Sequence, residues 1–108
     1  MTVTVADVLR GAMEYITPEG TWIQGDLFRE ATPSIGRPRG YCASGAISCS
    51  VQNLGLPNGI LTDVWRGSLD ALRQAIGSEH IPDWNDNPSR TQEDVLLAFK
   101  RAIEIAED

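Results

Sequence analysis

Residues 91–106 read TQEDVLLAFKRAIEIA and carry the clearest structural signal in the chain. Their apolar residues recur every three or four positions, which is the period of one face of an α-helix. Thr91 and Asp94 form a variant of the capping box, and the acidic residues at this end suit the helix dipole. The stretch therefore predicts an amphipathic helix. Its apolar face consists of Val95, Leu96, Phe99, Ala102, Ile103 and Ala106.

The same period occurs in two segments nearer the N-terminus. Residues 5–16 follow Thr4, which forms a second capping-box variant with Asp7, and Pro18 ends the segment because proline disfavours helix in the residue before it. Residues 42–54 are followed by Gly55, a typical C-terminal cap. Both segments predict helices whose apolar faces contribute to one core.

Residues 61–76 are also helical in period, but Gly67 and Ser68 interrupt the pattern. We therefore predict a short helix followed by a longer one, which Ser68 caps and Gly77 closes. The preceding residues 56–59, LPNG, predict a turn.

Three further segments lack a helical period. Residues 81–88, IPDWNDNP, predict a loop around Trp84, and residues 31–40 predict a second loop rich in Pro, Gly and Arg. Residues 21–28 are compatible with either a short extended piece or one helical turn. The pattern as a whole predicts a single all-α domain over residues 1–108, a compact bundle of four to five helices with little or no sheet, in which the tryptophans Trp22, Trp65 and Trp84 fill gaps.

Composition restricts the class of protein. The 108 residues have a net charge of −6, with 42% hydrophobic and 22% charged residues, which is typical of a folded globular domain. The acidic balance opposes non-specific binding of nucleic acid, because such binding requires clustered Lys and Arg. No apolar run approaches the roughly 18 residues of a transmembrane helix, and the N-terminus does not match a signal peptide. We therefore expect a cytoplasmic protein without a membrane partner.

Cys42 and Cys49 are seven positions apart, about 10.5 Å along a helix. A disulfide requires Cα atoms within about 7 Å, so both cysteines are expected to be thiols. Together with His80, the only histidine, they are too few for a structural zinc site. We expect neither a metal nor another cofactor.

Cys42 has two interpretations. It follows a loop and begins a helix, where unpaired N–H groups and the dipole lower the pKa of a thiol. With His80 as base and Asn85 or Asp86 orienting that base, it could act as a catalytic nucleophile. Alternatively, Cys42 is a small core residue at the head of a helix. The second interpretation is preferred, because the chain lacks a predicted sheet on which such a histidine would stand.

Three other features have similar alternatives. Arg37 and Arg39 could bind an anion or belong to a solvated loop. Trp84 could stack against a ligand while its neighbours Asn85 and Asp86 bind it, or it could fill the core while they cap backbone N–H groups. The small residues around Gly45 could form a ligand groove or a close packing contact.

Four motifs together resemble a family of short uncharacterised proteins from actinobacteria and their bacteriophages, notably mycobacteriophages. They are residues 22–25 (WIQG), 42–47 (CASGAI), 81–86 (IPDWND) and 90–95 (RTQEDV). The resemblance covers most of the chain from Trp22 onward and implies no activity. It includes no dedicated histidine at the position of His80, which disfavours the catalytic interpretation.

The sequence thus favours a small acidic protein-interaction module, an accessory protein of phage or prophage origin that binds a host protein or itself. The alternative function is a cysteine-dependent hydrolase or transferase that uses Cys42 with His80. A small anion-binding protein that uses Arg37 and Arg39 is a third possibility. The sequence leaves the oligomeric state and the partner open.

Overall fold

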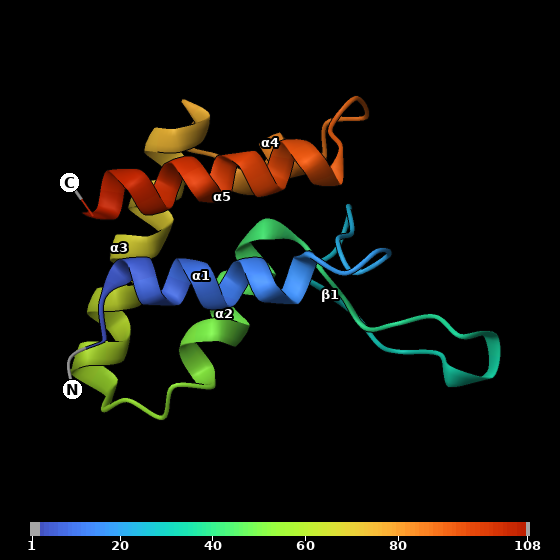
Figure 1. The fold of residues 1–108 in the computed structure, drawn as a ribbon, viewed down its shortest axis with the longest axis horizontal. Coiled ribbons are helices and arrows are strands. Elements are labelled where there is room, and N and C mark those ends of the chain that lie inside the picture. Colours follow the sequence, from blue (N-terminus) through green and yellow to red (C-terminus); the bar gives the residue numbers. More distant parts are fainter. Residues whose placement is uncertain (1–2, 108) are drawn as a thin grey trace.

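The computed structural model describes residues 3–107, in which three long helices surround the core (Figure 1). Helix α1 (Val5–Ile16) and helix α5 (Gln92–Glu107) run side by side, and helix α3 (Asn58–Ile76) crosses behind them. Helices α2 (Ala43–Gln52) and α4 (Ile81–Asn85) complete the set within the described residues. The predicted helical bundle is confirmed, and no described helix is both long and apolar enough to cross a membrane.

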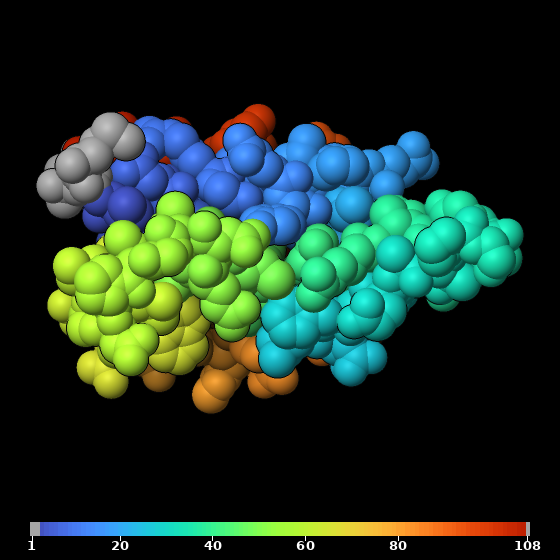
Figure 2. Space-filling model, turned by 90° about the horizontal axis from the view of Figure 1, so that it is seen from below, coloured from blue at the N-terminus to red at the C-terminus, as the bar shows by residue number. Residues whose placement is uncertain are grey.

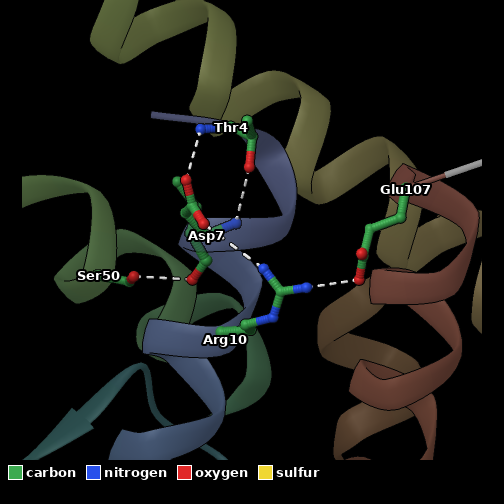
Figure 3. A network of polar contacts seen from close by, with 6 residues as sticks. Thr4, Asp7, Arg10, Ser50 and Glu107 are labelled. Carbon is green, nitrogen blue, oxygen red and sulfur yellow. Dashed lines mark hydrogen bonds and ion pairs between the residues drawn. The ribbon is translucent and has the colours of Figure 1, made fainter. Parts of the chain in front are cut away.

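Both predicted capping boxes form. The Asp7 amide donates to Thr4 Oγ1 at 3.1 Å, and the Thr4 amide donates to Asp7 Oδ2 at 3.0 Å, so helix α1 begins where the sequence predicts (Figure 3). Arg10 lies one turn further on and bridges Asp7 to Glu107 near the end of helix α5. Thr91 and Asp94 make the equivalent pair of hydrogen bonds ahead of helix α5.

Helix α2 packs closely on helix α1 through small residues. Ser50 Oγ donates to the Val8 carbonyl at 2.7 Å, the dashed line drawn from Ser50 in Figure 3. A Cβ added at Gly11 would lie 2.5 Å from the same Oγ. Glycine at position 11 therefore allows the two helices to approach. Helix α2 ends at the cap residue Asn53, so the predicted cap at Gly55 is wrong by two positions.

The predicted break within residues 61–76 is wrong, because helix α3 is continuous. Ser68 does not cap a new helix; its Oγ donates to the carbonyl of Val64 one turn earlier, which satisfies the hydroxyl inside the helix. Gly67 leaves space for Val5 of helix α1, whose Cγ2 would lie 2.7 Å from an added Cβ. Gly77 ends the helix in a left-handed conformation, as predicted, with φ of 66°.

Two predicted irregular segments contain helix. The turn expected at residues 56–59 is shorter than predicted, since helix α3 already begins at Asn58. Residues 81–85 form helix α4, with Pro82 in its first turn, where a proline needs no hydrogen-bonded N–H. The many turn-forming residues of this segment thus lie within and around one short helix.

The described residues also contain a two-stranded antiparallel sheet, so the helical prediction is correct only in outline. Strand β1 (Phe28–Arg29) pairs with strand β2 (Gly40–Tyr41), and the 3-10 helix η1 (Pro33–Ile35) lies between them. We call residues 28–41 the arm. Figures 1 and 2 both show the arm extending beyond the helices, at the end opposite the chain termini.

The core lies between helices α1, α2, α3 and α5. Phe99, Leu9 and Leu72 are among its largest fully buried side chains. Trp22 and Trp84 are half-buried against it, in keeping with their expected gap-filling role. Trp65 is 39% exposed, so the prediction that it fills a gap is wrong.

Candidate functional site

Cys42 is the N-cap residue of helix α2 and is only 4% exposed. Its sulfur accepts a hydrogen bond from the Gly45 amide at 3.3 Å, and its own amide donates to the Leu27 carbonyl at 3.1 Å. Burial raises the pKa of the Cys42 thiol, and the hydrogen bonds to helix amides only partly oppose that effect. The environment therefore favours the neutral thiol rather than the reactive thiolate.

His80 is exposed and precedes helix α4. It lines an open hollow of about 410 Å³, whose walls include Ser44, Ser48 and Trp65 but not Cys42. The structure therefore gives His80 a solvent-facing environment, whereas the Cys42 sulfur is enclosed and already accepts a helix amide. Both cysteines are free thiols, as their spacing predicts.

Asn85 is fully buried and holds three segments together. Its Oδ1 accepts from Trp22 Nε1 at 2.7 Å and from the Ala43 amide, the first of helix α2, at 3.0 Å. Its Nδ2 donates to the Ile23 carbonyl and to Asp86 Oδ1, each at 3.0 Å. All the hydrogen-bonding groups of this side chain are thus occupied by the protein itself, which argues for a structural role.

Residues next to Asn85 strengthen the same junction. Gln24 Nε2 donates to the carbonyls of Asn85 and Asn87 at 3.0 and 2.7 Å. The Gly25 amide donates to Asp86 Oδ1 at 2.9 Å. The motifs 22–25 and 81–86 therefore bind each other directly, and Ala43 connects both to helix α2.

Gly45 explains the small residues around Cys42. A Cβ at this position would collide with the carbonyl oxygen of Leu27, and Phe28 lies directly beside it. The close contact is therefore with the backbone entering the arm rather than with another helix. Together, the hydrogen bond that the Cys42 amide donates to the Leu27 carbonyl and the close packing of Gly45 fix the arm to the start of helix α2.

The remaining candidates occupy separate surfaces. Trp84 is half-buried, and the Arg90 guanidinium lies 4.0 Å from the centre of its ring while Arg90 Nε donates to the Trp84 carbonyl. Arg37 and Arg39 are exposed on the arm. Arg39 lies 5.5 Å from the ring centre of Tyr41 and 5.9 Å from that of Phe28.

The structure therefore places Cys42 and Asn85 in one buried junction and leaves His80, Trp84 and the arm arginines apart from it. Within the described residues, no group of three His, Cys, Asp or Glu side chains could hold a metal ion. The feature that sequence reasoning missed is the arm, which residues 31–40 suggested only as a loop. Thr32 and Arg37, whose backbones pair across η1, flank the Pro33 and Gly36 turn residues that could have indicated a hairpin.

These observations define a small helical domain with a hydrogen-bonded junction and an extended hairpin. The chain belongs to a family of unknown function, DUF6197, whose model matches residues 1–105. Comparison with curated proteins and with solved structures finds no match.

Proposed function

We propose that this chain is a protein-interaction module whose contact element is the arm, and that it is an accessory protein of phage or prophage origin that binds a host protein. The observation that carries the proposal is the arm itself. It extends beyond the helices in both views, and Ile35 within it is 69% exposed (Figures 1 and 2). An element that extends from the helices and carries an exposed apolar side chain can reach a surface on another molecule.

The arm is held in shape without a partner. Thr32 and Arg37 exchange backbone hydrogen bonds at 2.9 and 3.1 Å. At the base, the Arg29 guanidinium donates to the carbonyls of Gly20 and Pro38, each at 2.8 Å. A preformed element loses little conformational entropy when it binds, so the arm is suited to recognition.

The charge of the arm indicates the chemistry of its partner. Residues 28–41 contain three arginines and one glutamate, a net charge of +2, within a chain whose net charge is −6. The remaining residues therefore carry −8. A partner surface that combines an apolar hollow with carboxylates would complement Ile35 and the exposed arginines.

Photo-crosslinking tests the proposal. A photoreactive amino acid replaces Ile35, and the matched control carries it at Ile60, which is 50% exposed near the start of helix α3. In lysate of an actinobacterium, position 35 should crosslink one protein species that position 60 does not. Unlabelled wild-type protein should abolish the crosslink, whereas unlabelled Ile35→Asp protein should not. Equal labelling from both positions, or competition by the variant, would contradict the proposal.

A further inference from the structure

A groove lies beside the base of the arm. It has a volume of about 420 Å³ and lies between helix α1 and the end of helix α2, which Figure 2 shows side by side with the arm continuing past them. We call it the α1–α2 groove. Its lining combines two carboxylates with apolar and small residues: Asp7, Gly11, Glu14, Tyr15, Ser50, Asn53 and Leu54.

The groove and the arm form one continuous surface. The Tyr15 ring in the groove lies tilted against the Tyr41 ring of strand β2, with centres 5.0 Å apart and planes at 56°. Arg39 lies over the same Tyr41 ring, and Phe28 meets that ring edge-on at 6.2 Å. Through these rings Arg39, at the base of the arm, adjoins the groove.

This surface carries opposite charges at its two ends. The arm contributes a net charge of +2. The lining of the groove includes two carboxylates and no basic residue; Asp7 already pairs with Arg10, which leaves Glu14 as the carboxylate outside these ion pairs. Among the three ion pairs found in residues 3–107, none involves Glu14, Arg37 or Arg39. These exposed charges are therefore free to meet a partner.

Apolar side chains accompany the charges at both ends. On the arm, Phe28 is 37% and Ile35 is 69% exposed, and Leu54 in the groove is 38% exposed. A surface that is basic and apolar at one end, and acidic and apolar at the other, complements itself when two copies lie antiparallel. Such two-fold contacts are the commonest form of self-association.

We infer that the partner of this surface is a second copy of the chain, with the arm of each copy lying on the α1–α2 groove of the other. Ile35 then packs near Leu54, and the arm arginines face Glu14. The inference rests on the proposed function, because both assign contact to the arm. In the purified protein, a second copy of the chain then covers the arm. A host protein would therefore have to compete with that copy for the arm.

Charge exchange tests the inference by sedimentation equilibrium of the purified chain. Wild-type protein should form a dimer. Glu14→Arg and Arg39→Glu should each raise the dissociation constant about tenfold or more, since each places like charges together. The double variant should recover most of the wild-type affinity. A monomeric wild-type protein would overturn the inference. A double variant whose dissociation constant is raised by the product of the two single-variant effects would overturn it as well.

Two further variants keep the test decisive. Arg39 lies over the rings of Tyr41 and Phe28, so Arg39→Glu could also loosen the arm. Arg37→Glu reverses the charge of another arm arginine, one for which no such ring contact is found among residues 3–107. It should also weaken the dimer and be rescued by Glu14→Arg. Glu104→Arg on helix α5 is the matched control, because it makes the same charge change at an exposed position outside the groove and should leave the dimer unchanged.

The outcomes separate the two proposals. If the purified chain is monomeric but position 35 crosslinks a different protein in lysate, the self-association fails and the proposed function stands. If charge exchange behaves as expected but position 35 crosslinks only the chain itself, the self-association stands and the host-binding function fails.

Discussion

Replacing Asn85 by alanine should destabilise the fold severely. The change leaves Trp22 Nε1, the Ala43 amide and the Ile23 carbonyl without their present partners. A buried polar group left unpaired costs about 1–3 kcal/mol. Since the three groups can relax partly or admit water, we expect a total loss of about 3 kcal/mol in the free energy of unfolding. That is a large fraction of the roughly 5–15 kcal/mol typical of a domain.

Urea unfolding followed by circular dichroism measures this loss. A second variant, Asn85→Leu, keeps most of the side-chain volume and should be destabilised about as much as Asn85→Ala, because the same polar groups are left unpaired. The matched control is Asn87→Ala, which removes one exposed hydrogen bond to the Ser89 amide and should cost less than about 1 kcal/mol. If Asn85→Ala and Asn87→Ala unfold at the same urea concentration, the junction does not stabilise the fold as argued.

Three other changes have defined outcomes. Gly45→Ala should lower the free energy of unfolding by about 2 kcal/mol or more, because the added Cβ collides with the Leu27 carbonyl. Gly59→Ala, at an open helical position, should raise it by about 0.5 kcal/mol. Equal unfolding midpoints of the two variants would refute this packing. Arg29→Met should speed tryptic cleavage after Arg39 by freeing the base of the arm, and unchanged cleavage would show that Arg29 does not hold it. The Thr4 amide holds the pKa of Asp7 below its ordinary value of 3.8, so the stabilisation by Asp7 is present above that pH and is lost as the pH falls below it. Wild-type stability should therefore fall more steeply than that of Asp7→Asn between about pH 5 and 2, as urea midpoints would show; parallel curves would contradict it.

The parts of the fold that the sequence predicts are those set by local interactions. Helices α1 and α5 each have an apolar stripe and a capping box within a few residues, so their starts are correct. Helix α3 was predicted as broken because glycine and serine side by side disfavour helix locally. Gly67 lies inside the helix and packs against Val5, more than sixty residues away, a contact that no local pattern indicates.

For the junction, the sequence indicates which residues stand out but not which of them contact one another. Trp22 and Asn85 were recognisable as parts of motifs, but they are 63 positions apart, and Asn85 and Ala43 are 42 apart. No periodicity indicates which distant amide a buried Asn accepts from. The arm was missed for a related reason, because its strands are only two residues long and show no alternation that sequence reasoning could detect.

The Cys42 motif lies in a buried structural junction, and the arm is the element proposed to contact other molecules. Alkylation of the folded protein, followed by mass spectrometry of each cysteine, measures whether the Cys42 sulfur is enclosed. Burial raises the pKa of both thiols, but Cys49 is half-buried whereas Cys42 is 4% exposed. Cys49 should therefore be modified first, and Cys42 only as rapidly as the fold opens, with a large acceleration in urea. Modification of Cys42 in the folded protein as fast as in urea would show instead that its sulfur is open to solvent in the fold.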